Sequence, residues 1–309
     1  MIPVYAIGCA GNDQIGLNIL DEMNNAGINT VGVQKCADAS TMYSVCFQYP
    51  DRTGGNITTS NSACELVSAE SVSIFFSDFG NDFGNDYNND YNNCLTGKGM
   101  LLATPEVFID ARIALLAEGR KRGCFNVASV LSSEVKEFDA KGGFELVDMI
   151  AINIDEAEAI ARYYRPEAGQ KEIQNNCISF LTSKNKDMKI IKTNGKNGSI
   201  TYQSGNIEAV PVLNSNVVST AGAGDSFLAG TMTGLIYGLT FQKNVCDEYF
   251  GQTPVASAVE LATLVTSMKI QSQNTINFDV NAVSLNNFAK NKNITFSEEF
   301  NKLLWERMI

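Results

Sequence analysis

GMLLATPEVFIDARIALLAEGRKRGCFNVASV, residues 99–130, joins two short apolar runs through one longer segment. The two runs, GMLLA and CFNVASV, have the length and composition of buried strands. Between them, Thr104 is placed to cap a helix, Pro105 suits its first position, and Gly123 lies beyond its end. A strand, a helix and a strand in this order predict a βαβ unit with parallel strands.

The same alternation continues through the rest of the chain. Further strands are expected at residues 4–8, 146–153, 188–193, 199–203 and 207–212, a hairpin at 41–60, and helices at 155–164, 222–238 and 253–270. This order predicts an α/β protein with a mostly parallel central sheet flanked by helices. Ligands of such sheets bind at the carboxyl ends of the strands, where the loops NIDE, TNGKNG and STAGAGD fall.

Composition excludes several classes of function. The 309 residues carry a net charge of −11, which argues against nucleic acid and against an anionic membrane surface as partners. No apolar run is long enough to span a membrane, and the first residues do not resemble a secretion signal. The eight cysteines form no C-x-x-C motif, so we expect free thiols and a cytoplasmic location.

The chain contains no histidine, which excludes Ser-His-Asp and Cys-His catalysis, His-ligated zinc and a histidine base. Acid–base chemistry then falls to Asp, Glu, Lys, Tyr or Cys. One acid stands out, because Asp225 follows the small residues Gly222, Ala223 and Gly224 at the start of a predicted helix.

The loop STAGAGD, residues 219–225, is suited to an anion. Glycines let a backbone approach a ligand closely, and the free amides of a helix N-terminus attract negative charge. An ionised Asp225 beside such a cradle could accept a hydroxyl proton during phosphoryl transfer. An equally strong interpretation is structural: Asp225 is an ordinary acid in a first helical turn, and the glycines form a tight packing turn.

Two other loops have ordinary structural explanations when each is taken alone. Asn153 and Glu156 can form a capping box at a strand-to-helix junction, and TNGKNG can be a simple turn between strands. The sequence lacks the G-x-x-x-x-G-K-[ST] motif of P-loop enzymes. The glycines in IGCAGNDQIG do not have the spacing of a dinucleotide-binding loop.

Together these motifs resemble the ribokinase-like carbohydrate kinases, the phosphofructokinase-B family. STAGAGDSF is similar to the family's C-terminal signature, Asn153 and Glu156 match its N-x-x-E motif, TNGKNG matches its T-x-G turn, and IGCAGNDQIG is similar to its V-G-x-D-x-x-G segment. The resemblance covers the chain from about residue 4 to about residue 287. It implies a single ribokinase-like three-layer domain over residues 1–309, with a partial β-lid at about 34–67.

The resemblance also implies roles for individual residues. Asp225 would be the general base for a sugar hydroxyl, and the loop amides of Gly222, Ala223 and Gly224 would form the anion hole. ATP and Mg²⁺ would be the cofactors, with Glu156 holding the metal indirectly, through water. The remaining residues implied at the nucleotide are Asn153, Thr193, Gly195, Gly198 and Thr220.

The chain departs from the family pattern at its start. Family members usually open with a further strand, lid strands and a G-G-x-x-x-N helix that supply much of the sugar pocket, and this opening portion is not in the sequence. Position 219 is Ser where Asp is commoner, and residues 271–279 lack the family's usual Gly-Ala pattern near the adenine. The alternative is therefore a truncated, catalytically impaired kinase fold that binds nucleotide or a partner.

Two further segments stand apart from these motifs. Residues 79–94 are a tandem repeat of four residues rich in Asn and Asp, which we interpret as a polar surface loop rather than a calcium site built on Asp82, Asp86 and Asp90. Near the C-terminus, Thr295 and Glu298 have capping-box spacing before an apolar helix face. We expect that face to pack on the chain's own core, with a homodimer as the alternative.

Overall fold

The computed structural model describes residues 2–49, 54–79, 99–243 and 249–305. The chain forms two compact units, one of residues 1–83 and 104–118 and the other of residues 84–103 and 119–309. In the described part of the chain, no helix has both the length and the apolar character needed to cross a membrane. The six cysteines that the structure describes are all free thiols.

The first unit begins with a strand–helix–strand motif. Strand β1 (Val4–Gly11) pairs in parallel with β2 (Ile28–Cys36), and α1 (Gln14–Asn25) connects them. The strand predicted at residues 4–8 is therefore present and extends to Gly11. Within the described residues this pair is a two-stranded sheet of its own.

Asp13 has a structural role in this motif. Its carboxylate caps α1 by accepting from the Gly16 amide at 2.8 Å, and it also accepts from the amide and the hydroxyl of Thr41, each at 2.8 Å. These hydrogen bonds stabilise the charged carboxylate and lower the pKa of Asp13. A single acid thus fixes the helix start and the distant segment at Thr41.

The hairpin predicted for residues 41–60 is present as β3 (Ser44–Gln48) and β4 (Gly54–Thr58), which pair antiparallel. Its turn, residues 50–53, and most of the tandem repeat, residues 80–94, lie outside the described residues. The first unit also contains η1 (Ala63–Leu66), α2 (Ala69–Asp78) and the start of α3 (Ile109–Arg122).

The second unit contains a six-stranded sheet in the order β10-β9-β8-β7-β6-β5. The four strands from β5 to β8 are parallel, while β9 and β10 are antiparallel. This confirms the mostly parallel sheet expected from the sequence. The strands are β5 (Met100–Ala103), β6 (Phe125–Ala128), β7 (Met149–Ile152), β8 (Lys189–Thr193), β9 (Ser199–Gln203) and β10 (Asn206–Val210).

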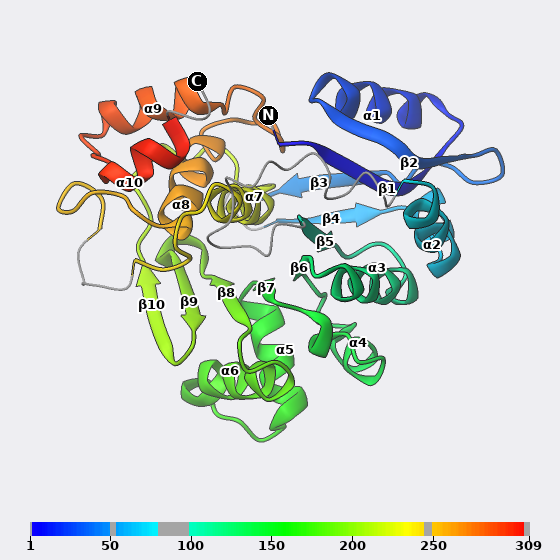
Figure 1. Ribbon diagram of the computed structural model, residues 1–309, viewed down its shortest axis with the longest axis horizontal. Coiled ribbons are helices and arrows are strands. Elements are labelled where there is room, and N and C mark those ends of the chain that lie inside the picture. The colour runs from blue at the N-terminus through cyan, green and yellow to red at the C-terminus, as the bar shows by residue number, and fades with distance from the viewer. Residues whose placement is uncertain (1, 50–53, 80–98, 244–248, 306–309) are drawn as a thin grey trace. The chain divides into compact units, whose positions relative to one another are not determined.

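Helices cover both faces of this sheet, which gives the three layers of an α/β fold. Helices α5 and α6 lie on one side and α7 and α8 on the other (Figure 1). The helices of this unit are α4 (Val135–Ala140), α5 (Ile154–Tyr164), α6 (Ile173–Lys184), α7 (Ala223–Ile236), α8 (Ala258–Lys269), α9 (Ala282–Asn291) and α10 (Glu298–Phe300).

Small residues let α7 pack closely against α8. A Cβ atom added at Gly230 would lie 2.7 Å from the Cα of Ala262, and one at Gly234 would lie 2.8 Å from the Cα of Ala258. Neither position has room for a side chain, so these glycines set the distance between the two helices. This spacing positions the N-terminus of α7, where the STAGAGD loop ends.

Three predicted helix starts are wrong. The helix expected at residues 253–270 begins at Ala258, because the Ser257 hydroxyl caps it there by accepting from the Glu260 amide. The helix after β5 begins at Ile109 rather than just after Thr104, because Glu106 has a φ of 68°, a left-handed conformation that a helix cannot contain. At the C-terminus, Ser297 rather than Thr295 caps the helix, since its hydroxyl accepts from the Phe300 amide at 3.0 Å. The expected apolar face is buried in the chain, with Phe300 fully covered.

Candidate active site

Asn153 and Thr193 lie at the carboxyl ends of the neighbouring parallel strands β7 and β8. The hydroxyl of Thr193 donates to the carbonyl oxygen of Ile152 at 3.5 Å, which ties the two strand ends together. The residues predicted at Asn153, Glu156 and Thr193 therefore form one group at this edge of the sheet, where ligands of such sheets bind.

Asn153 and Glu156 form a reciprocal capping box at the start of α5. The Asn153 side-chain oxygen accepts from the Glu156 amide at 2.9 Å, while the Glu156 carboxylate accepts from the Asn153 backbone amide at 2.8 Å and its side-chain amide at 3.1 Å. Burial raises the pKa of Glu156, and the negative charges of Asp155 and Glu134 add to this effect. The capping function that the sequence suggested is thus present.

The turn after Thr193 needs its glycines for different reasons. Both Gly195 and Gly198 have positive φ angles, of 53° and 84°. A Cβ atom at Gly198 would overlap the carbonyl oxygen of Val210, whereas one at Gly195 would meet open space. Gly198 is therefore required for packing against the end of β10, and Gly195 leaves an open surface beside Thr193.

The loop before α7 presents free backbone amides. Gly222 caps the helix in the left-handed conformation, with φ 75°. The Ala223 amide donates to the Thr220 carbonyl oxygen at 3.0 Å, so it is already used. Among the described residues, the amides of Gly224 and Asp225 have no acceptor, and the Asp225 side chain is exposed.

The resemblance implied an anion hole formed by the amides of Gly222, Ala223 and Gly224. Of these three, the Ala223 amide is already bonded within the loop, and the Gly224 amide has no acceptor among the described residues. A 14-residue helix follows them, so its positive N-terminal end lies at the same point. The arrangement can bind an anionic group such as a phosphate.

Lys269, at the end of α8, is a site residue that sequence reasoning missed. Its ammonium group donates to the carbonyl oxygens of Ser219 and Ala221, at the back of the loop. Lys269 precedes the loop's other anchor, Ile270, whose carbonyl oxygen accepts from the amides of Val218 and Ser219. A lysine in the last turn of an otherwise apolar helix was the available signal.

The segment after α8 reaches the loop from another direction. Thr275 lies so close to Gly222 that a Cβ atom there would overlap the Thr275 carbonyl oxygen. The apolar side chains of Ile276 and Phe278, which follow Thr275, are 60% and 64% exposed. Exposed apolar groups beside an anion cradle are suited to the flat face of a nucleotide base.

The predicted site residues thus fall into two groups of the second unit. One comprises Asn153, Glu156, Thr193, Gly195 and Gly198, and the other comprises Thr220, Gly222, Ala223, Gly224 and Asp225, with Lys269 behind it. In the part of the chain that the structure describes, no hydrogen bond joins the two groups. A bound molecule long enough to contact both would be needed to connect them.

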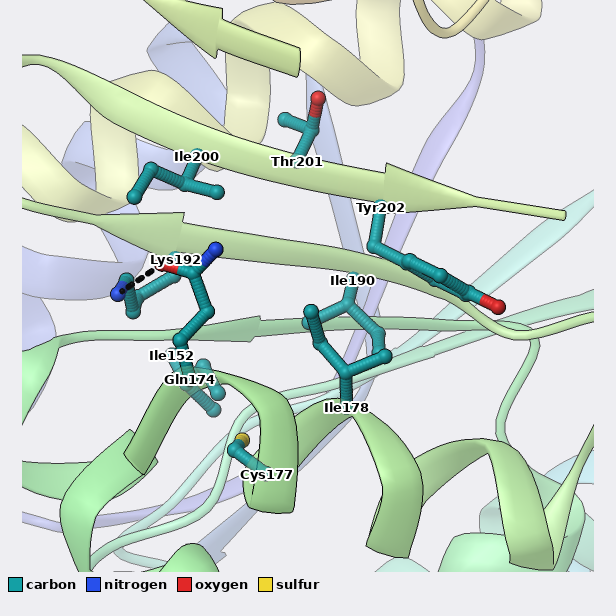
Figure 2. A pocket seen from close by; sticks show the side chains of 9 residues that line it. All are labelled: Ile152, Gln174, Cys177, Ile178, Ile190, Lys192, Ile200, Thr201 and Tyr202. Atoms are coloured by element: carbon teal, nitrogen blue, oxygen red, sulfur yellow. Dashed lines mark hydrogen bonds between the residues drawn. The ribbon is translucent and has the colours of Figure 1, made fainter. Parts of the chain in front are cut away.

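A small pocket lies elsewhere, between α6 and strands β7, β8 and β9 (Figure 2). Its lining is mainly apolar, and Lys192 donates to the side-chain oxygen of Gln174 at 3.1 Å across it. Burial raises the pKa of the Cys177 thiol to about 12, so the thiol is protonated at neutral pH. The pocket contains none of the predicted site residues.

The fold is that of a ribokinase-like α/β protein. Residues 1–282 match the family described as pfkB family carbohydrate kinase, and the chain belongs to that family. Family and fold together indicate a phosphotransferase of the sugar or nucleoside kinase kind. Among curated proteins, none matches the sequence significantly.

Solved structures share the fold at low sequence identity. A putative ribokinase II from E. coli in its apo form has a TM-score of 0.70 at 15% identity, over 94% of this chain and 84% of that one. An adenosine kinase from Schistosoma mansoni, in complex with 2-fluoroadenosine, has a TM-score of 0.68 at 14% identity, over 88% of this chain and 75% of that one.

An aminoimidazole riboside kinase from Salmonella enterica is also similar. It was solved with aminoimidazole riboside and an ATP analogue, and its TM-score is 0.64 at 16% identity, over 93% of this chain and 86% of that one. Its likeness, like the others, shows a ribokinase-like fold for this chain.

Proposed function

We propose that this protein transfers the terminal phosphoryl group of ATP to a hydroxyl group of a sugar or sugar-like molecule. Asp225 takes the proton from that hydroxyl as its oxygen forms the new bond to phosphorus, and ADP leaves with the electrons of the broken bond. The amides of Gly224 and Asp225 stabilise the charge on the transferred group. Thr220 and Ala223 shape the loop that presents them.

The observation that carries this proposal is the pair of unbonded amides at the start of α7, with the exposed carboxylate of Asp225 beside them. A structural acid at a helix start would be expected to accept a backbone amide, as Asp13 does at α1. The Asp225 carboxylate has no such bond among the described residues. Family membership supports a use for it in phosphoryl transfer.

The residues present fit ATP and Mg²⁺. A Cβ atom at Gly224 would meet open space, so a phosphate can approach the backbone there. Glu156 accepts hydrogen bonds from Asn153 on both carboxylate oxygens, which retain lone pairs for water molecules around a metal ion.

Mg²⁺ bound to ATP would neutralise phosphate charge and orient the terminal group for transfer. Asn153 holds Glu156 in place for the metal's water shell. Thr193, Gly195 and Gly198 form the part of the nucleotide site at the strand ends, and the β3–β4 hairpin serves as part of a lid for the sugar. The free thiols are suited to a reducing compartment such as the cytoplasm.

The test is Asp225→Asn, which keeps the shape of the side chain and removes the base. We expect ATP binding, measured by calorimetry, to remain close to wild type, and phosphoryl transfer, measured as ADP release over a panel of sugars and nucleosides, to fall by about 10²–10⁴-fold. Asp187→Asn, an exposed surface acid between α6 and β8, is the matched control and should leave both unchanged.

Three results would count against this proposal or one of its parts. Turnover of Asp225→Asn at the wild-type rate would remove Asp225 as the base. A wild-type protein that binds ATP but phosphorylates no member of the panel would instead favour the alternative, a nucleotide-binding protein of kinase fold without turnover. Transfer by the wild type in excess EDTA would contradict the role of Mg²⁺.

A further inference from the structure

Lys269 is almost completely buried at the C-terminal end of α8, with 1% of its surface exposed. Lysines are seldom buried to this extent, because removing an ammonium group from water is costly unless it is well hydrogen-bonded. Its position therefore requires an explanation. If the position were needed only for packing, an apolar side chain would fill it at a lower cost in free energy.

The ammonium group is bonded to the loop that precedes α7. It donates to the Ser219 carbonyl oxygen at 3.4 Å and to the Ala221 carbonyl oxygen. The neighbouring carbonyl of Ile270 accepts from the amides of Val218 at 2.8 Å and Ser219 at 3.1 Å. Lys269, the last residue of α8, thus binds carbonyl groups of residues 219 and 221. Ile270, which follows it, binds the amides of residues 218 and 219.

This anchoring extends to the free amides. Thr220 lies between the two residues that Lys269 holds, and its own carbonyl oxygen accepts from the Ala223 amide at 3.0 Å. The next two amides, of Gly224 and Asp225, have no acceptor among the described residues. If the carbonyls of Ser219 and Ala221 lost their common donor, they would turn toward other partners and the start of α7 would change with them.

The charges at this point are complementary. Lys269 lies in the last turn of α8, where the negative end of the helix favours a cation, and beside the loop that begins α7. Burial lowers the pKa of Lys269, and the carboxylate of Asp225 acts in the opposite direction by favouring the charged ammonium group.

We propose that Lys269 is a positioning residue whose ammonium group serves as a built-in cation for the phosphate-binding loop. It holds residues 219–221 in the shape that leaves the Gly224 and Asp225 amides free, and it places a positive charge beside Asp225. An ammonium group has three N–H donors, and the carbonyl oxygens of Ser219 and Ala221 use two of them. The catalytic consequence rests on the proposed kinase function, whereas the effect on loop shape does not.

The first experiment needs no substrate. Lys269→Met removes the charge and keeps a similar length, and Lys290→Met, at an exposed position of α9, is the matched control. Amide hydrogen exchange of residues 218–225 should be faster by about tenfold or more in Lys269→Met, and ammonium chloride should restore protection where sodium chloride at the same concentration does not. Lys290→Met should exchange like the wild type under both salts.

The second experiment uses turnover. In Lys269→Met we expect kcat to fall by about 10–100-fold and the KM for ATP to rise, with partial recovery of kcat in ammonium salt. Lys269→Gln, which restores a neutral donor, should recover loop protection more than it recovers kcat. A lysine needed only for packing would give no recovery with ammonium.

The outcomes separate the two proposals. Wild-type exchange in Lys269→Met, or ammonium no better than sodium, overturns the role of Lys269. Failure of both neutral variants to fold, with or without ammonium, overturns it as well, because the residue is then purely structural. If the wild-type protein phosphorylates nothing, the kinase function fails while the exchange experiment still decides the role of Lys269.

Discussion

Gly222 constrains the shape of the STAGAGD loop, which we propose binds phosphate. Its φ of 75° disfavours any side chain, and a Cβ atom would overlap the carbonyl oxygen of Thr275. We expect Gly222→Ala to destabilise the protein by about 1–3 kcal/mol and to weaken ATP binding, because both the strain and the overlap oppose the native loop. Thermal denaturation and calorimetry with ATP measure the two effects.

Gly224→Ala is the matched control for stability, since it makes the same chemical change two residues away. Gly224 has no positive φ, and its Cβ atom would meet open space, so the melting temperature should change by the equivalent of about 0.5 kcal/mol or less. Equal losses of stability in the two variants would contradict the assignment of strain to Gly222.

Some residues of the candidate site could be predicted from the sequence, and others could not. Asp225 and the glycines before it were found because they are contiguous and form a recognisable pattern. Lys269 is 48 residues from Ala221 in the chain, and only the folded structure brings its ammonium group to the loop. The amides that remain free could also be identified only from the structure, because the hydrogen bond from the Ala223 amide to the Thr220 carbonyl oxygen depends on the local path of the backbone.

Glu156 links the start of α5 to the proposed metal site, and its raised pKa predicts a pH dependence. The carboxylate must be ionised to attract the water shell of Mg²⁺, and the pKa is raised above the ordinary value of 4.5, chiefly by burial. The contribution of Mg²⁺ to ATP binding should therefore weaken as pH falls below neutral, at a higher pH than an ordinary glutamate would lose its charge. Calorimetry over this range, with and without Mg²⁺, measures it.

Replacing Asp155 tests whether Glu156 is the group responsible for this pH dependence. Its negative charge adds to the raised pKa of Glu156, so Asp155→Asn should move the loss of Mg²⁺-dependent binding to lower pH. The surface variant Asp187→Asn should not move it. A shift in the opposite direction for Asp155→Asn would exclude Glu156 as the group responsible.

The close contact between α7 and α8 should reverse the usual effect of a Gly-to-Ala substitution on the free energy of unfolding. Gly to Ala in the middle of a helix is normally stabilising, by about 0.5–1 kcal/mol. At Gly230 the added Cβ atom would lie 2.7 Å from the Cα of Ala262, so we expect Gly230→Ala to destabilise by about 1–3 kcal/mol instead. Urea denaturation measures the change, and Ala229→Met on the exposed side of α7 should have little effect.

At the scale of elements, periodicity and helix signals located β7, α5, β8 and α7 well, because buried strands and capped helices leave local patterns. The start of α8 was predicted at residue 253, and the helix begins at Ala258. The start of α3 was misplaced because Thr104 and Pro105 form a valid helix signal, while the left-handed Glu106 that cancels it has no signature in the sequence. Ser297 and Thr295 were equally good caps by composition, and tertiary packing selected Ser297.

At the scale of the whole molecule, both groups of candidate site residues belong to the second unit, while the proposed lid hairpin belongs to the first. The sequence predicted a single kinase domain over residues 1–309, and it contained the alternation that specifies the sheet. It could not indicate how the contacts divide, because the apolar strand β1 resembles the strands of the larger sheet and yet pairs with β2 in a separate sheet of the described residues.

Because the proposed nucleotide contacts and the proposed lid belong to different units, the two ligands should protect different segments from hydrogen exchange. A non-hydrolysable ATP analogue with Mg²⁺ should protect segments of the second unit, around residues 153–156, 193–198 and 219–225, because every proposed nucleotide contact lies there. Residues 44–49 and 54–58 of the hairpin should gain protection only when an acceptor sugar is added. The first ligand tests the nucleotide site, and the second tests the lid.

Two outcomes would contradict this prediction. Hairpin protection by the nucleotide analogue alone would show that the first unit takes part in nucleotide binding. An acceptor sugar that protects neither unit would exclude the hairpin as a lid for that sugar.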